Sequence, residues 1–490
     1  MKQHSRSAWL PALAASLGVL LASGVSAAAE TAAAPDDEVE ALMREAAADD
    51  ARNAAAQRSP TAPSGATPSP APGGAPPAAQ AGSPSDVRGF AQLELARAYQ
   101  SPTHWSKMLG RVEFGTQGKT EDGLKWKLSA RVDYDAVFAA TNFYGADVRR
   151  DQQFNVVLRE NYFDKGIGDW EIRVGRQHVI WGEMVGLFFA DVVPARDMRQ
   201  FILPEFNLLR IPQWAVRAEY FRDDFHGELL WIPVATYDET GKPVGSDGKP
   251  GSEFFPYQLL PLGYLNEVKP ATKLSNSNYG ARGSWLVKGW DLSAFYYRSM
   301  DASPTFYQTP DPTSPAGLSY QARHDRISQI GGTLAKDFGS MVLKAETVYT
   351  RGRRLPLTVV RPSEPEGVVP QNTLDWVVGL DFPFPSETRL NLQAFQTITS
   401  NNDPDVIPKK RESGYSVLLN GKLTPNLEAE VLWVASLDRS DWMLRPKLNW
   451  NFEKNWRLVF GVDAFRGPVT GFFGRYNAQD RVYTELRRSF

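Results

Sequence analysis

One run of strict alternation between apolar and polar residues limits most strongly what this chain can fold into. From Leu124 to Phe138, aromatic and aliphatic side chains alternate with charged or small polar ones. Successive side chains of a β-strand point to opposite faces, so one face of this segment is apolar and the other carries charge. Strands of soluble domains usually have about 3–10 residues, and this run is longer. Membrane barrels need strands of such length, with an apolar lipid face and a polar lumen face.

The same pattern recurs to the terminal Phe490 and predicts the number of strands. Gly, Pro, Asn and Asp separate the alternating segments, and short turns alternate with long loops. We therefore predict an all-β fold, a transmembrane antiparallel β-barrel over residues 87–490 with about 18 strands, or about 16 as the alternative. Both ends of the barrel should lie on the side of the short turns, and bulges are expected at Gly175 and Pro446. The predicted strands begin near Gly89, Lys107, Leu124, Gln152, Trp170, Gln213, Phe225, Ser277, Trp290, Arg326, Met341, Thr373, Thr388, Ser413, Leu427, Asp441, Trp456 and Arg481.

The first 86 residues predict three segments that precede the barrel. Residues 1–27 have the pattern of a secretory signal peptide, in which basic residues precede an apolar stretch and a small-residue cleavage site. The alternative, a transmembrane anchor, needs about 20 apolar residues, and this stretch is shorter. Residues 28–58 are acidic and rich in Ala, which favours a helix, and residues 59–86 should form a disordered Pro/Ala/Ser/Gly linker. Export and barrel strands together predict a location in the cell outer membrane.

Composition excludes several classes of function. The chain has no Cys, which excludes disulfides and thiolate chemistry, and its formal net charge of −2 provides no basic field for nucleic acid. The 5 His residues show no metal-ligand spacing, and no nucleophile motif is present. We therefore predict no catalytic, metal or cofactor-binding residues and no enzyme. The many Trp, Tyr and Phe residues fit the aromatic girdles of a membrane barrel.

Three parts of the sequence predict partners other than membrane lipid. The last strand ends at Phe490 and resembles the signal by which the barrel-assembly machinery recognises outer-membrane barrels, although Arg488 departs from that pattern. Residues 36–58 are expected to contact a periplasmic or inner-membrane export partner. Two basic runs are expected to contact lipopolysaccharide, or alternatively to attract an anionic cargo. These runs are Arg351, Arg353, Arg354 and Arg361, and Lys409, Lys410 and Arg411.

One motif is more specific than the barrel pattern. Gly175-Arg176-Gln177 closes a predicted strand, Trp181-Gly182-Glu183 follows it, and a loop with Pro194 and Asp197 comes next. This stretch resembles a family of Gram-negative outer-membrane β-barrels of unassigned function, and it is distantly similar to alginate-export barrels. The spacing from Pro194 to Asp197 is one residue longer than in that family. The resemblance implies export or passage of hydrophobic or polymeric material.

The loop over residues 182–212 is unusually apolar for a segment that connects two strands. Connecting loops are normally polar and exposed, so this loop should be covered, and the lumen is the available cover. We predict an inward-folded constriction, with a structural loop that braces the wall as the alternative. The expected polar anchors are Arg176, Trp181, Glu183, Arg196, Asp197 and Arg199, and the expected apolar residues include Leu187, Phe188, Phe189, Phe201 and Ile202.

These features predict an outer-membrane channel or export duct for a hydrophobic, amphipathic or polymeric cargo. A barrel of about eighteen strands is wide enough for an aqueous lumen. The alternative is a plugged surface-binding or structural barrel that acts through its loops or its N-terminal arm.

Overall fold

The computed structural model describes residues 87–490, except residues 183, 185–188, 246, 257–262, 315–316, 386 and 401–402. The chain divides into two compact units, Met1–Ser69 and Pro70–Phe490, and every described residue belongs to the second. The predicted signal peptide, acidic segment and linker (residues 1–27, 28–58 and 59–86) lie outside the described residues. Apart from the gaps given above, the structure describes the whole region of the predicted barrel, residues 87–490.

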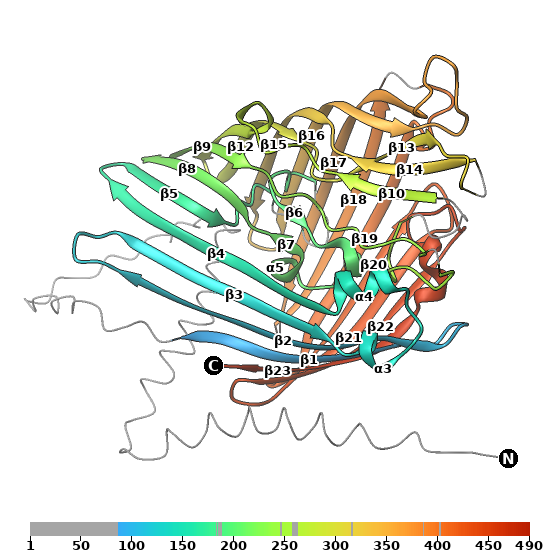
Figure 1. The fold of residues 1–490 in the computed structure, drawn as a ribbon. Coiled ribbons are helices and arrows are strands. Elements are labelled where there is room, and N and C mark those ends of the chain that lie inside the picture. The colour runs from blue at the N-terminus through green and yellow to red at the C-terminus, as the bar shows by residue number, and fades with distance from the viewer. Residues whose placement is uncertain are drawn as a thin grey trace, which may run out of the picture. The chain divides into compact units, whose positions relative to one another are not determined.

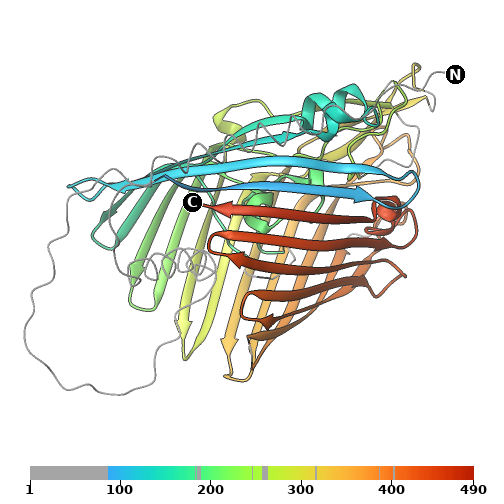
Figure 2. The same cartoon turned by 90° about the horizontal axis from the view of Figure 1, so that it is seen from below.

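Eighteen strands form one antiparallel sheet that closes on itself. Each strand pairs with the next along the chain, and β1 pairs with β23, so the first and last strands lie side by side (Figure 1, Figure 2). The predicted fold class and strand number are confirmed. The barrel strands are β1 Arg88–Ala98, β2 His104–Lys119, β3 Lys125–Asp135, β4 Phe154–Ile167, β5 Trp170–Gln177, β8 Gln213–Arg222, β9 Phe225–Val234, β11 Asn278–Val287, β12 Trp290–Met300, β15 Arg326–Asp337, β16 Val342–Pro356, β17 Val368–Phe384, β18 Thr388–Ser400, β19 Arg411–Thr424, β20 Leu427–Ser436, β21 Trp442–Glu453, β22 Trp456–Arg466 and β23 Arg481–Ser489.

The period of two in the sequence separates the outer surface of the barrel from its lumen. In β1, Gln92 and Glu94 are buried, while Leu93 and Leu95 are exposed. The outward-facing residues of the other strands are also mostly apolar, as contact with the hydrocarbon core of a membrane requires. The buried set contains many charged residues, so the lumen is polar. Sequence alternation alone therefore places charge inside and apolar surface outside.

Long loops lie at one end of the barrel and short turns at the other. The long loops carry a separate three-stranded sheet, a two-stranded pair inside the loop after β5, and short helices. Within the described part of the chain, no helix has the length and apolar character to cross a membrane. The loop elements are β6 Ala195–Arg196, β7 Arg210–Ile211, β10 Gly263–Val268, β13 Thr305–Pro310, β14 Leu318–Arg323, α3 Val137–Ala140, α4 Ala146–Gln152, α5 Phe206–Leu209, η1 Met198–Gln200, η2 Leu274–Asn276 and η3 Gly474–Gln479.

The expected bulge at Pro446 is wrong. Pro446 pairs with Val431 in register, and the β21–β22 register stays constant from Trp442 to Trp450 before it shifts. The β22 ladder has no paired position at Pro446, because a proline has no N–H to donate. The strand therefore tolerates this proline by omitting ladder contacts on one side, without adding a residue.

The expected bulge at Gly175 is also wrong. The ladders of β5 with β4 and with β8 run through Gly175 without a register shift. Gly175 has a φ of +132°, a region that side chains rarely adopt, and a Cβ there would lie 2.3 Å from the carbonyl oxygen of Asn161. The neighbouring irregularity lies in the β3–β4 pairing, where the register shifts between Leu128 and Ala130.

The conformation of Gly175 predicts a large effect of the smallest possible substitution. We expect Gly175→Ala to lower the free energy of unfolding by about 1–3 kcal/mol, because the methyl group adds strain and a clash with the β4 backbone. Gly166→Ala is the matched control, since a Cβ at that position of β4 has no heavy atom closer than 4.0 Å. Urea unfolding in lipid vesicles measures the free energy of unfolding of both variants. Equal stability of Gly175→Ala and Gly166→Ala would contradict the prediction.

Candidate functional site

The segment after β5 crosses the lumen. We call residues 178–212, as far as they are described, the inward segment. Near its start, Val179 and Trp181 pack in an apolar cluster with Phe295 of β12 and Val348 of β16. Farther along, Phe201 packs in a second cluster with Phe465 of β22. These strands lie in different parts of the closed sheet, so the inward segment connects distant parts of the wall.

Trp181 fixes the first part of the inward segment by both packing and a hydrogen bond. Its ring lies 5.2 Å from the ring of Phe295, and its Nε1 donates a hydrogen bond of 3.0 Å to Glu228 of β9. The side chain is only 1% exposed. A buried indole N–H needs such a partner, and a charged acceptor makes the bond stronger than a neutral one.

Glu346 of β16 holds two backbone groups of the inward segment at once. Its carboxylate accepts hydrogen bonds from the backbone N–H of Met184, at 3.0 Å, and of Ala190, at 2.8 Å. Glu346 is 3% exposed, and hydrogen bonds to a carboxylate are roughly twice as strong as neutral ones. One wall residue thus fixes the backbone at Met184 and at Ala190 to the inner face of β16.

Three strands on another part of the wall hold the middle of the inward segment. Arg445 of β21 donates to the carbonyl oxygens of Leu203, at 2.7 Å, and Ile202, at 3.4 Å. Glu205 forms ion pairs with Arg457 of β22, at 2.6 Å, and Arg487 of β23, at 3.1 Å. The Arg445 hydrogen bonds satisfy two backbone carbonyls that have no partner in regular secondary structure. The ion pairs of Glu205 fix the same part of the segment to β22 and β23.

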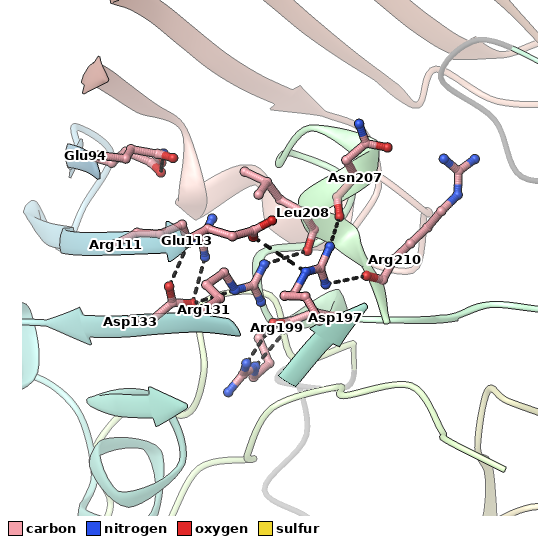
Figure 3. A network of polar contacts seen from close by, with 12 residues as sticks. Glu94, Arg111, Glu113, Arg131, Asp133, Asp197, Arg199, Asn207, Leu208 and Arg210 are labelled. Carbon is pink, nitrogen blue, oxygen red and sulfur yellow. Dashed lines mark hydrogen bonds and ion pairs between the residues drawn. The ribbon is translucent and has the colours of Figure 1, made fainter. Parts of the chain in front are cut away.

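Two arginines of β3 and β4 bind the C-terminal end of α5. Arg131 donates to the carbonyl oxygen of Leu208 at 3.2 Å. Arg159 donates to the carbonyl oxygen of Arg210 at 2.9 Å and to that of Asn207 (Figure 3). The last carbonyls of a helix have no partner within the helix, so guanidinium donors are suited to this position.

The same arginines belong to a charged network on the inner wall. Asp133 accepts two hydrogen bonds from Arg111, at 2.7 and 2.9 Å, and lies 3.4 Å from Arg131 (Figure 3). Arg159 lies 3.5 Å from Glu113. The acidic residues fix the guanidinium groups in place, and the arginines in turn fix α5.

The predicted anchor residues occupy different positions along this path. Asp197 pairs with Arg199 at 2.7 Å, and within the described residues no ion pair joins Asp197 to Arg176. Arg176 is half-buried at the end of β5, next to Asn161 of β4. The backbone N–H of Arg196 donates to Asp238 at 2.7 Å. The structure thus brings Asp197 and Arg199 together and leaves Arg176 apart.

The predicted apolar residues are only partly described. Glu183, Leu187 and Phe188 lie outside the described residues. The ring of Phe189 lies 5.7 Å from that of Phe395 in β18, and Ile202 packs against the cluster around Phe201. Phe201 also has a positive φ of 53°, so its position is imposed by the surrounding aromatic rings.

Sequence reasoning missed the residues of the wall that hold the inward segment. These residues have the lumen-facing parity of their strands, which is the only signal that the sequence contains. Many other charged residues have the same parity, and their spacing does not reveal which of them meet a distant loop. The missed residues are Arg131, Arg159, Glu228, Glu346, Arg445, Arg457 and Arg487.

The carboxylates of Asp197 and Glu205 in the inward segment keep their charge at neutral pH. Burial raises the pKa of Asp197, but the adjacent Arg199 lowers it to a net value of about 2. Burial likewise opposes ionisation of Glu205, whereas Arg457 and Arg487 lower its pKa to about 2. Because the Glu205 side chain is 45% exposed, water weakens each of its ion pairs to about 0–1 kcal/mol.

A cavity of about 210 Å³ remains between the inward segment and the wall. Its lining combines apolar and charged side chains from the inward segment, the loop after β12, and β15 to β17. Arg353 lies 3.3 Å from Asp301 in this lining. The lining residues are Phe189, Asp191, Val192, Pro194, Arg196, Ser299, Asp301, Ala302, Ser303, Ile327, Gln329, Val348, Arg353 and Asp375. The cavity can therefore contact both the apolar and the charged part of an amphipathic molecule.

The charges of the first basic run are partly balanced by acidic loop residues. Arg353 pairs with Asp301, and Arg361 lies 2.8 Å from Asp403. Arg354 lies 3.4 Å from Asp325. Among the described residues, no group of three or more His, Asp or Glu side chains is arranged to hold a metal ion. The expected contact of this run with lipopolysaccharide stays a prediction.

The comparison with protein families decides the family of this chain. A family model described as "Protein of unknown function (DUF1302)" matches residues 9–441. The chain belongs to this family. No curated protein matches its sequence.

Solved structures with a similar fold include outer-membrane β-barrel porins. Acinetobacter baumannii OccAB1 is 7% identical with a TM-score of 0.51, over 84% of this chain and 98% of that one. Pseudomonas aeruginosa OccK8 (OprE) is 10% identical with a TM-score of 0.48, over 83% of this chain and 97% of that one. At these identities the similarity shows the fold alone, and the argument rests on OccAB1. The DUF1302 chain has a porin-like β-barrel fold.

The double contact at Glu346 predicts a gain of conductance on substitution. Glu346→Gln replaces one acceptor oxygen by an amide NH₂, so one of the two backbone N–H groups loses its partner at a cost of about 1–3 kcal/mol. We expect the released state of the inward segment to gain about 5- to 150-fold in population. Planar-bilayer recordings measure this as a higher open probability.

Glu412→Gln is the matched control for this substitution. Glu412, at the start of β19, pairs with Arg439 of the loop before β21, and the described structure shows no hydrogen bond or ion pair from Glu412 to the inward segment. We expect its open probability to equal that of the parent protein. An equal response of the two variants would show that Glu346 does not hold the inward segment.

The low pKa of Glu205 predicts how its contribution depends on pH. The pKa lies below the ordinary value of 4.5, so the carboxylate stabilises the closed arrangement fully above that value. This contribution is lost as the pH falls from about 4.5 to about 2. We expect Glu205→Gln to raise the open probability at pH 7 by up to about fivefold, given ion pairs worth about 0–1 kcal/mol. The difference from the parent should vanish near pH 2, and a difference that grows on acidification would contradict the assignment.

Proposed function

We propose that this protein is an outer-membrane channel or export duct for hydrophobic, amphipathic or polymeric cargo, with the inward segment as its constriction. The porin-like barrel supports a channel and a location in the outer membrane. We propose the polymeric class of cargo from the sequence resemblance of Gly175-Arg176-Gln177 to a strand end of alginate-export barrels.

The observation that carries this proposal is the cavity of about 210 Å³ between the inward segment and the wall. Its lining combines apolar side chains, such as Phe189 and Val192, with the charged side chains of Asp301 and Arg353. Small ions need only polar groups and water along their path. A path with both kinds of surface favours molecules that have an apolar part and a polar part.

A second candidate is a plugged barrel that acts through its surface. The inward segment is held by β16, by β21 to β23 and by β3 and β4, which suits a permanent plug as well as a gate. The sheet of β13, β14 and β10 in the long loops provides a rigid surface for a binding partner. The contacts proposed for residues 36–58, for Phe490 and for the basic runs are compatible with both candidates.

Removal of the constriction separates the two candidates. We expect purified protein to show a small conductance in planar bilayers, and a much larger one when residues 184–211 are replaced by a short Gly/Ser linker. Replacement of residues 358–366, in the loop between β16 and β17, is the control and should leave the conductance unchanged. A barrel that stays closed without residues 184–211 would favour the plugged candidate.

A further inference from the structure

The barrel wall is incomplete beside β4. The β4–β5 ladder ends where Asn161 pairs with Arg176, while β4 continues along β3 as far as Phe154, opposite Tyr134. Figure 1 shows β4 running on past the end of β5. Within the described residues, no strand and no backbone group pairs with residues 154–160 on the β5 side. We call the region between this edge and the start of β8 at Gln213 the window.

The cause of the window is the path of the inward segment. After Gln177 the chain does not continue along β4 but turns inward, where Val179 and Trp181 pack on β9, β12 and β16. β5 is therefore the shortest strand of the barrel, with 8 residues against 14 in β4. An unpaired edge exposed to hydrocarbon is unfavourable, so the window must be covered by side chains or by a ligand.

The outer surface beside the window is strongly apolar. Phe154, Val156 and Leu158 point outward, and Phe154 and Val156 are both 60% exposed. These residues lie in the half of the wall nearest to the long loops, which is the extracellular half in outer-membrane barrels. An acyl chain of the outer leaflet can lie along this surface.

The inner side of the window is lined by cationic groups. Arg159 of β4 closes the window from within, because it donates to the carbonyl oxygens of Asn207 and Arg210. Its guanidinium also lies 3.4 Å from His178. Arg131 and Arg159 are 3% and 4% exposed, and their Nε atoms lie 3.4 Å from Asp133 and 3.5 Å from Glu113. The Nε of Arg176 is buried without a hydrogen-bond partner.

The buried Nε of Arg176 is an independent indication of a ligand. Buried polar atoms almost always have partners, so this unpartnered guanidinium nitrogen beside the window needs an explanation. Carboxylates and phosphates are the groups that arginine binds most strongly, often through two parallel hydrogen bonds. A molecule with an anionic head inside the window and an apolar tail outside satisfies both surfaces.

We propose that the window is a lateral portal through which an acyl-chain amphiphile with an anionic head passes between the lumen and the outer leaflet. This inference rests on the proposed channel function and names its substrate class. The head group replaces the carbonyl oxygens of Asn207 and Arg210 as the partner of Arg159. Loss of those hydrogen bonds frees α5 and β7 from β4, and the tail moves out along Phe154, Val156 and Leu158.

Photolabelling in vesicles tests the binding part of the proposal. The probes are a palmitate analogue and a lysophosphatidate analogue, each with a diazirine on the chain, and the uncharged hexadecanol analogue. We expect both anionic probes to label residues 154–160 and 206–211 at least about fivefold more than the outward surface around Phe460 of β22. Hexadecanol should label the two regions equally. A preference for only one anionic probe would identify the head group as carboxylate or phosphate.

Two variants show whether the arginines cause this labelling. Arg159→Gln and Arg176→Gln should each reduce labelling of the window by the anionic probes at least about threefold. Arg439→Gln, which alters a pair among the distant loops, should leave it unchanged. Equal labelling of the window and of the region around Phe460 by every probe would mean ordinary surrounding lipid only, and would overturn the proposal.

Cross-linking tests the passage part, and the chain allows it because it contains no Cys. Val157→Cys with Asn207→Cys, joined through two disulfides by a bifunctional methanethiosulfonate reagent, ties α5 to β4 and closes the window. Lys447→Cys with Pro204→Cys ties the inward segment to β21 and leaves the window free. We expect only the first cross-link to reduce vesicle-to-vesicle transfer of the palmitate probe, at least about tenfold, with ion conductance retained.

The two proposals fail in different ways. Unchanged palmitate transfer after the first cross-link would overturn the portal, while continued conductance would still support a channel. If the protein without residues 184–211 shows no conductance and no palmitate transfer, both the channel and the portal are overturned. Reduction of the cross-links should restore transfer, which excludes misfolding as the cause of its loss.

Discussion

The structure depends on one constraint, which is that backbone groups facing hydrocarbon must find partners within the protein. Eighteen strands meet this constraint by closing on themselves, with β1 paired to β23. The same constraint explains why the loop after β5 cannot simply leave the wall without consequence. Its own carbonyls are bound by arginines from the wall, and it leaves residues 154–160 of β4 without a strand partner on the β5 side.

Charge in the lumen serves to position chain and not only to attract ions. Paired arginines and carboxylates on neighbouring strands would be a costly way to stabilise a dry core. Inside a barrel, the guanidinium groups of Arg131, Arg159 and Arg445 instead serve backbone carbonyls of an irregular segment. This arrangement keeps an irregular segment fixed in a wet lumen, while the apolar clusters around Trp181 and Phe201 give it a defined depth.

The sequence predicts the wall well and the lumen poorly, for one physical reason. Lipid on one side and water on the other impose a period of two on every strand, so alternation identifies all eighteen strands. No comparable rule governs which lumen residue meets a loop. Glu346 differs in no local respect from other inward carboxylates, and its role follows only from the position of Ala190, more than a hundred residues earlier in the chain. Gly175 shows the same limit, because its positive φ reflects the adjacent β4 backbone and not its own neighbours in sequence.

The geometry at Glu346 also determines how the inward segment is released from β16. Both hydrogen bonds to the inward segment end on one carboxylate, one on each oxygen, and the bonded N–H groups come from Met184 and Ala190. When one bond breaks, the carboxylate can rotate toward water, which weakens the other bond as well. The two contacts therefore break together, and the inward segment gains or loses its hold on β16 in one step. Release from β16 is thus all-or-none, while the contacts with β3, β4, β9 and β21 to β23 still hold the rest of the segment.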